Sequence, residues 1–254
     1  MKNILNKIKL HLKSFRVFII LMKRLKFNFI PWIFLKSGAE YSLNMDGDEL
    51  VLRKGSTDYE VARSTKKEFN ILKHSLPQDY SGVIIDAGGY IGTAAIAFSK
   101  LYPNAIVVCV EASSDNFKIL KKNCRKYSSI IPLNNALSAL SGETINLSDR
   151  KTGNWGFTTV ESPKDNPNAK FKEKIKTISI NDIQHKYGKS ELIKLDIEGA
   201  EKEILNTDLA LRGIKIIMIE LHDRINPGCS EAFFNFSRNR TILKDTGEKY
   251  ISIS

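Results

Sequence analysis

Asp86, Gly88 and Gly92 lie at the end of one apolar run of the sequence. Glu111 directly follows the next apolar run, residues 105–110. A buried strand that ends in a carboxylate, turns on glycines and enters a helix can bring backbone N–H groups to a bound molecule. An acid at the end of the following strand can accept hydrogen bonds from ribose hydroxyls. These four residues together predict a site for a nucleoside cofactor.

The spacing of the glycines distinguishes between two kinds of nucleoside cofactor. A dinucleotide fingerprint has glycines at its first, third and sixth positions, so that the pyrophosphate can approach the helix N-terminus. Counted from Gly88, these positions hold Gly88, Tyr90 and Thr93. The ring of Tyr90 would stand where the phosphates must come, so the spacing disfavours an NAD-dependent oxidoreductase, which stays as the alternative.

A second group of candidate residues follows two later apolar runs. Asp196 ends one run and Glu198 lies in the turn after it, while Glu220 and His222 lie at the end of the next run. Ligands of parallel sheets bind at the carboxyl ends of the strands, so these side chains should face the same crevice. Carboxylates beside an imidazole can deprotonate a hydroxyl group. Asp196, Glu220 and His222 could instead hold a divalent cation, or the acids could serve only in helix capping and ion pairs.

Five ordered segments between about residues 41 and 222 resemble the FkbM-type methyltransferases. The segments are Arg53-x-Gly55-x-x-Asp58, Asp86-x-Gly88-x-x-x-Gly92, 111–116, 135–138 and 194–201, followed by 219–221. The resemblance implies a class I (Rossmann-like) methyltransferase fold with S-adenosyl-L-methionine as cofactor. It also implies O-methylation of sugars, polysaccharides or other natural products.

The resemblance further implies roles for individual residues. The residues expected at the cofactor are Asp58, Asp86, Gly88, Gly89, Tyr90, Gly92, Glu111, Ala112, Asn116, Asn135 and Ala136. Asn135 and Ala136 would lie near the adenine, and Asp196 and Glu198 near the methyl group that is transferred. The residues expected to be catalytic are Asp196, Glu198, Glu220 and His222.

One part of the turn departs from the family pattern D-x-G-A-N-x-G. This chain has Gly89 and Tyr90 where the pattern has alanine and asparagine. A cofactor contact from that asparagine side chain is therefore absent here, although contacts from the backbone could remain.

The net charge of +11 is concentrated at one end of the chain. Residues 1–37 contain nine basic and no acidic residues, and the remainder contains 30 basic and 28 acidic residues. A nearly neutral body gives no indication of a nucleic-acid partner. The three cysteines form no C-x-x-C pair and predict neither a zinc site nor disulfides, which fits a cytoplasmic protein.

Apolar residues in 1–37 recur every three or four positions with lysine and arginine between them, which predicts an amphipathic helix. The longest uninterrupted apolar run is six residues, 17–22, whereas a membrane-spanning helix needs about 20. We expect this segment to be a peripheral anchor on an anionic membrane surface. The alternative is a helix that packs on the body or on another subunit of a homo-oligomer.

The remaining pattern predicts a cap at 38–80 and a cofactor-binding domain at 81–254. In the cap we expect a hairpin around Asp46-Gly47-Asp48 and a helix near 64–72. In the domain, the expected strands are 83–86, 106–110, 130–133, 192–196 and 215–221, and the expected helices lie near 93–101, 114–127 and 200–211. Uniformly apolar strands alternating with helices indicate a mostly parallel α/β sheet with flanking helices.

Two further segments complete this expected fold. Residues 143–180 interrupt the alternation with strand pieces around a loop at 161–174, and the C-terminal tail could add an antiparallel hairpin over 245–247. The leading hypothesis for function is a methyltransferase acting on a small-molecule or glycan acceptor. The alternatives are an NAD-dependent oxidoreductase and a non-catalytic binding module at a membrane.

Overall fold

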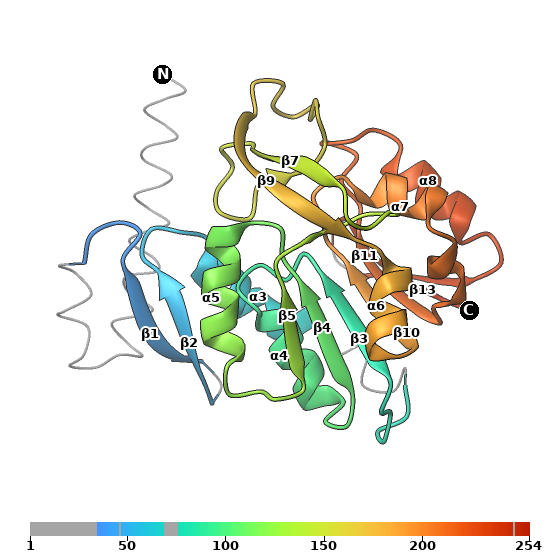
Figure 1. Ribbon diagram of the computed structural model, residues 1–254, viewed down its shortest axis with the longest axis horizontal. Helices are drawn as coiled ribbons and strands as arrows, with labels where there is room; N and C mark the ends of the chain where they lie inside the picture. The colour runs from blue at the N-terminus through green and yellow to red at the C-terminus, as the bar shows by residue number, and fades with distance from the viewer. Residues whose placement is uncertain (1–34, 46, 69–75, 246) are drawn as a thin grey trace. The chain divides into compact units, whose positions relative to one another are not determined.

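The computed structural model describes residues 35–45, 47–68, 76–245 and 247–254 (Figure 1). The chain divides between Tyr59 and Glu60 into two compact units. This division falls inside the segment predicted as the cap, and the predicted domain boundaries stay predictions. Residues 1–34, which include most of the expected amphipathic segment, lie outside the described residues. Within the described part of the chain, no helix is both long and apolar enough to span a bilayer.

The first unit contains the expected hairpin. Strand β1 (Glu40–Met45) pairs antiparallel with β2 (Asp48–Arg53). The side chains of Leu43, Met45, Leu50 and Leu52 alternate with more exposed ones and are buried, as expected for strands with one apolar face. The helix after the hairpin, α3 (Asp58–Glu68), begins earlier than the predicted helix at 64–72. Its first turn is fixed by Asp58, whose carboxylate accepts hydrogen bonds from the Arg53 side chain.

The second unit is built on a sheet of seven strands in the order β12-β13-β11-β10-β3-β4-β5. The strands are β3 (Val83–Ala87), β4 (Ile106–Val110), β5 (Ile130–Leu133), β10 (Ser190–Leu195), β11 (Ile216–Glu220), β12 (Thr241–Lys244) and β13 (Lys249–Ile253). The first five are parallel, and β13 runs antiparallel to β11 and β12. The five predicted strands and the C-terminal hairpin are confirmed, with ends that differ by one or two residues.

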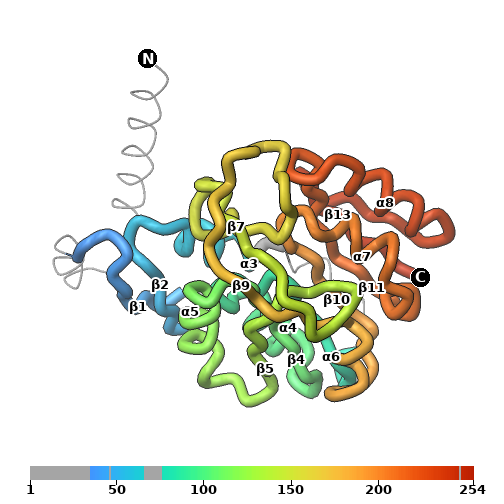
Figure 2. The backbone as a smooth tube through the Cα atoms, turned by 45° about the horizontal axis from the view of Figure 1, so that its top comes forward, coloured from blue at the N-terminus to red at the C-terminus, as the bar shows by residue number. Residues whose placement is uncertain are grey.

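Helices connect most of these strands. They are α4 (Thr93–Leu101), α5 (Ser114–Cys124), α6 (Ile180–Tyr187), α7 (Glu201–Thr207), a 3-10 helix (Leu209–Gly213) and α8 (Cys229–Phe236). The prediction of one helix at 200–211 is wrong, because Asp208 adopts an extended backbone and its side chain accepts a hydrogen bond from the N–H of Ala210. Helices α7 and α8 lie side by side in both views (Figures 1 and 2).

The segment between β5 and α6 forms a second, four-stranded sheet in the order β6-β9-β7-β8. Its strands are β6 (Ala136–Leu137), β7 (Thr144–Asp149), β8 (Phe157–Thr158) and β9 (Lys170–Ile178). The predicted loop at 161–174 is wrong from residue 170 onward, because β9 pairs antiparallel with β7 from Lys170. That pairing overrides the lysine-rich composition of the segment.

The order of the main sheet determines where a ligand can bind. Strand β3 has β4 on one side and β10 on the other, so the direction of the strand order reverses at β3. In open parallel sheets, a crevice forms at such a point, outside the carboxyl ends of the strands. In the view of Figure 1 the strands β7 and β9 lie above the main sheet. The hydroxyl of Thr158 in β8 donates to the carbonyl oxygen of Glu198, just beyond the end of β10.

Candidate functional site

A cavity of about 470 Å³ lies at the carboxyl ends of β3, β4, β10 and β11. It brings together most of the residues that the sequence predicted for the site. The predicted residues that line it are Gly88, Gly89, Tyr90, Glu111, Ala112, Asn116, Asn135, Ala136, Asp196, Glu198 and Glu220. Asp86, Gly92 and His222 are not among the lining residues, and Asp58 belongs to the first unit.

The glycine turn packs directly on the strand that carries the second group of residues. The backbone N–H groups of Gly88 and Gly89 both donate to the carbonyl oxygen of Val110, at 3.0 and 2.9 Å. Gly88 has a φ of 82°, and a Cβ at this position would lie 1.8 Å from the backbone oxygen of Asp196. Only glycine combines this left-handed backbone with so close an approach. The absence of a side chain at Gly88 therefore lets the turn lie directly against the end of β10.

The two residues that depart from the family pattern fit their surroundings differently. A Cβ at Gly89 would lie 2.3 Å from Sγ of Cys109, so the buried sulfur occupies the space that an alanine at 89 would need. Tyr90 has a φ of 51°, a left-handed conformation that asparagine tolerates better than an aromatic residue does. An alanine at 89 would therefore force the side chain of Cys109 to shift, whereas Tyr90 carries backbone strain.

Glu111 connects the turn to the next helix. Its Oε2 accepts a hydrogen bond from the N–H of Tyr90 at 2.8 Å, and its Oε1 accepts one from the N–H of Ser113 at 2.8 Å. The amide of Asn116 lies 3.4 Å from Oε1. A carboxylate has about four acceptor positions, so Glu111 can also receive hydroxyl groups from a molecule in the cavity.

Asp86 lies beneath the turn rather than in the cavity. Its side chain is fully buried, and burial raises the pKa of its carboxyl, against the opposing effect of Lys194. Oδ2 accepts a weak hydrogen bond from the thiol of Cys109 at 3.3 Å, and Oδ1 has no hydrogen-bond partner among the described residues. The Nζ of Lys194 lies 3.9 Å from Oδ1. Contact between Asp86 and a cofactor stays a prediction.

Three carboxylates from the ends of β10 and β11 line the other side of the cavity. Asp196 accepts a hydrogen bond from Lys194 at 2.9 Å. Burial raises the pKa of Asp196, but Lys194 and His222 outweigh that effect and lower the pKa to about 2. Glu198 forms an ion pair with Arg150, and Glu220 lies 3.5 Å from Lys249. Burial raises the pKa of Glu198 to about 7 in spite of the neighbouring cations.

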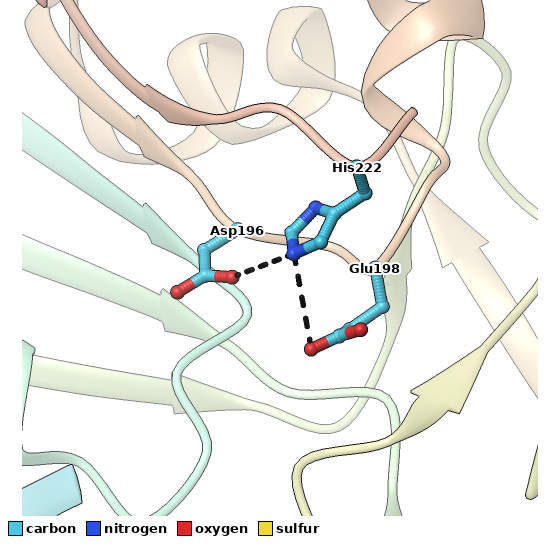
Figure 3. A group of neighbouring side chains, drawn as sticks. All are labelled: Asp196, Glu198 and His222. Atoms are coloured by element: carbon cyan, nitrogen blue, oxygen red, sulfur yellow. Dashed lines mark ion pairs between the residues drawn. The ribbon is translucent and has the colours of Figure 1, made fainter. Parts of the chain in front are cut away.

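The ring of His222 points toward Asp196 and Glu198 (Figure 3). Its Nδ1 is 2.9 Å from Oε1 of Glu201, and its Nε2 is 3.9 Å from Asp196, from Glu198 and from Glu220. Burial lowers the pKa of His222, but Glu201, Glu198 and Asp196 together raise it to about 9. Metal-ligating atoms of Asp196, Glu198 and His222 all lie within 4.8 Å of one another, so the group includes Glu198 where the sequence suggested Glu220.

Sequence reasoning missed two residues that organise this group. Glu201 is fully buried, and its carboxylate accepts hydrogen bonds from the N–H groups of Ile197 and Gly199 at 2.8 Å each. Its place three residues after Glu198, at the start of α7, was the signal that could have found it. Arg150 is also buried and forms ion pairs with Asp165 and Glu198. No local pattern marks Arg150, because β7 brings it to the site from far along the chain.

The model of the methyltransferase FkbM domain matches residues 86–250, which is more than half of the chain. None of the curated proteins compared with the chain matches it.

Solved structures with a similar arrangement share little sequence with this chain. The SAM-dependent methyltransferase from Agrobacterium tumefaciens has a TM-score of 0.46 and 12% identity, over 86% of this chain and 71% of that one. Aeropyrum pernix fibrillarin with natively bound S-adenosyl-L-methionine has a TM-score of 0.42 and 11% identity, over 86% and 84%. M. jannaschii TYW2 in complex with AdoMet has a TM-score of 0.43 and 11% identity, over 87% and 85%.

The expected fold and cofactor are confirmed. The α/β architecture, with its large, mostly parallel sheet and flanking helices, is that of class I methyltransferases. The cofactor is S-adenosylmethionine, and the alternative of an NAD-dependent oxidoreductase is set aside. The match over residues 86–250 shows that this chain belongs to the FkbM methyltransferase family.

Proposed function

We propose that this S-adenosylmethionine-dependent methyltransferase methylates a hydroxyl group of a sugar, a glycan or a related natural product. The observation that carries the proposal is the placement of Asp196, Glu198 and Glu220 around one cavity with the glycine turn at Gly88. Transfer to a hydroxyl needs a group that accepts its proton, and carboxylates within reach of the acceptor can do so.

The residues of the cavity fit the cofactor of the family. Glu111 presents a carboxylate that can accept hydrogen bonds from ribose hydroxyls. Ala112, Ala136 and Leu137 add small and apolar side chains to the same lining, which suits the flat face of an adenine. At Gly88 the absence of a Cβ allows the turn to lie against the end of β10.

The cofactor and the protein have different roles in the proposed reaction. When bound, S-adenosylmethionine would supply a methyl group from its positively charged sulfur, so that a carbon–oxygen bond to the acceptor would replace the carbon–sulfur bond. The protein would hold the acceptor hydroxyl close to that methyl group, and the carboxylates at the ends of β10 and β11 would receive the proton that leaves the hydroxyl. The contact between Gly88 and Asp196 fixes the distance between the two halves of the site.

The choice of a sugar-like acceptor is supported by an exposed aromatic side chain in the cavity lining. Trp155 lines it and is 43% exposed, which is unusual for so large an aromatic side chain. Its indole N–H donates to the carbonyl oxygen of Thr152 at 3.0 Å, which holds the ring in place. A fixed aromatic ring near several carboxylates can pack against the apolar face of a sugar while the carboxylates bind its hydroxyls.

The test uses the full chain, methyl-labelled S-adenosylmethionine and two sets of acceptors: sugars and glycans that offer only hydroxyls, and matched amines. We expect label on the hydroxyl-bearing compounds. Asp196→Asn should abolish transfer while S-adenosylhomocysteine still binds in calorimetry. Asp115→Asn is the matched control, because this acid pairs with Lys118 and Lys172 on the surface and does not line the cavity. Label only on the amines would contradict the proposal, and absence of S-adenosylhomocysteine binding would favour a non-catalytic module.

The basic segment 1–37 suggests in addition that the acceptor is linked to a membrane. Nine basic residues and no acidic ones would favour an anionic surface. Deletion of residues 1–37 should release the protein from liposomes that contain anionic lipid, without loss of S-adenosylhomocysteine binding. Continued liposome binding by the shortened chain would contradict a role of this segment as an anchor.

A further inference from the structure

The two ring nitrogens of His222 face different carboxylates: Nδ1 contacts Glu201, and Nε2 is directed toward three others at a longer distance. The side chain is 1% exposed, and Nε2 is the ring nitrogen that faces the cluster. It lies 3.9 Å from an oxygen of Asp196, of Glu198 and of Glu220. Figure 3 shows Nε2 pointing into the space between Asp196 and Glu198.

The spacing of these atoms suits a cation between them. Nitrogen and oxygen ligands lie about 2.1 Å from a first-row divalent metal ion, so two ligands of one ion are about 3.0 to 4.2 Å apart. The distances from Nε2 of His222 to Asp196 and to Glu198 are both 3.9 Å. All three ligand atoms lie within 4.8 Å of one another, so small side-chain rotations would close the set around one ion.

Glu201 supplies the outer contacts that a metal site of this kind requires. A histidine that binds metal through one ring nitrogen usually has its other nitrogen fixed by a carboxylate or carbonyl oxygen. Nδ1 of His222 is 2.9 Å from Oε1 of Glu201. The same carboxylate binds the N–H groups of Ile197 and Gly199, on either side of Glu198. Glu198 itself has a left-handed φ of 54°, which these bonds stabilise.

We propose that Asp196, Glu198 and His222 bind one divalent transition-metal ion of the Mn²⁺ type, and that Glu201 is a positioning residue for this site. One imidazole nitrogen with two carboxylate oxygens is a mixed set that suits Mn²⁺ or Fe²⁺ better than Mg²⁺, which prefers oxygen ligands alone. Three protein ligands leave coordination positions open toward the cavity that Asp196 and Glu198 line. An acceptor hydroxyl in such a position would lose its proton more readily, and Glu220, a cavity carboxylate that is not one of the ligands, would receive it. This last step rests on the proposed function, whereas the binding of the ion does not.

The test measures the binding of Mn²⁺ to the full chain, without cofactor or acceptor. After treatment with a chelator and dialysis, the protein is titrated with MnCl₂ and free Mn²⁺ is followed by electron paramagnetic resonance. We expect one ion per chain. Asp196→Ala should weaken binding at least tenfold, and Glu201→Gln, which removes only an outer contact, about 10- to 100-fold. His185→Ala is the control, because His185 is an exposed histidine on α6.

The design separates loss of binding from loss of folding. Thermal denaturation of each variant shows whether it folds. Asp196→Ala changes a residue that lines the cavity and leaves the buried His222 in place. Folded wild-type protein that binds no Mn²⁺, or that binds it equally in Asp196→Ala, would overturn the metal site. Mn²⁺ binding without methylation of any hydroxyl would overturn the proposed function and leave the metal site standing.

Discussion

A Cβ on Gly88 would lie 1.8 Å from the backbone oxygen of Asp196, so the glycine turn after β3 and the end of β10 touch through main-chain atoms alone. Backbone cannot move aside as the end of a long side chain can, so this contact fixes the spacing of the site. One half of the cavity contains Glu111, whose carboxylate can accept hydrogen bonds from a nucleoside. The other half contains the carboxylates at the ends of β10 and β11. The contact explains why a small change at residue 88 should affect both halves.

Gly88→Ala should destabilise the protein by at least about 3 kcal/mol, from the left-handed φ and from the overlap with Asp196. Thermal and urea denaturation measure this loss, and calorimetry with S-adenosylhomocysteine measures the cofactor site. Gly142→Ala is the matched control, because Gly142 has a φ of 83° but nothing within 4 Å of its added Cβ. It should cost only about 1–2 kcal/mol. Equal losses in the two variants would show that the contact with Asp196 is unimportant.

The pair of Gly89 and Cys109 predicts a coupling that a double-mutant cycle can detect. Gly89→Ala places a Cβ 2.3 Å from Sγ of Cys109, with Leu120 next at 3.0 Å. Cys109→Ala removes the sulfur and leaves room for that Cβ. The double variant should therefore lose less stability than the sum of the single variants, by about 1 kcal/mol or more. Strict additivity in urea denaturation would mean that the turn moves away from Cys109 instead.

Glu111→Gln should weaken the binding of S-adenosylhomocysteine about 10- to 100-fold, because a charge-assisted hydrogen bond contributes about 1.5–3 kcal/mol. The glutamine keeps one oxygen but loses the charge and one acceptor. Glu173→Gln is the control, since Glu173 accepts a hydrogen bond from the N–H of Ser114 at 3.1 Å but does not line the cavity. Calorimetry that finds equal affinity for Glu111→Gln and the wild type would contradict the assignment of Glu111 to the ribose.

Much of the main sheet could be predicted because its signals are local. The runs that became β3 and β4 are apolar throughout, and each ends in an acid that marks the carboxyl edge of the sheet. Helix α6 was missed although Ser179 caps it and accepts a hydrogen bond from the N–H of Asp182. Its cap follows β9 directly, and the apolar residues at that junction suit a strand or a helix equally.

Site residues that directly follow the end of a strand could be predicted from the sequence. Site residues that are placed by pairing between distant segments could not. Asp196 and Glu220 could be placed because the edge of a parallel sheet collects such residues. Arg150 could not be placed, because its ion pairs with Asp165 and Glu198 require the second sheet to be known first. The effect of a side chain at position 89 could not be predicted either, because it depends on the sulfur of Cys109 in the neighbouring strand.

Asp58 offers a test of a site residue whose cofactor contact stays a prediction. Its Oδ2 accepts hydrogen bonds from the backbone N–H and from Nε of Arg53 at 2.8 and 2.9 Å, and its Oδ1 accepts one from Nη2 at 2.8 Å. The carboxylate is fully buried. Asp58→Asn keeps the shape but removes the charge that Arg53 pairs with, so we expect a loss of about 1.5–3 kcal/mol in the free energy of unfolding. Amide hydrogen exchange in β1 and β2 should rise with it. A variant of unchanged stability with weakened S-adenosylhomocysteine binding would instead support the contact with the cofactor, because a purely structural ion pair would lower stability first.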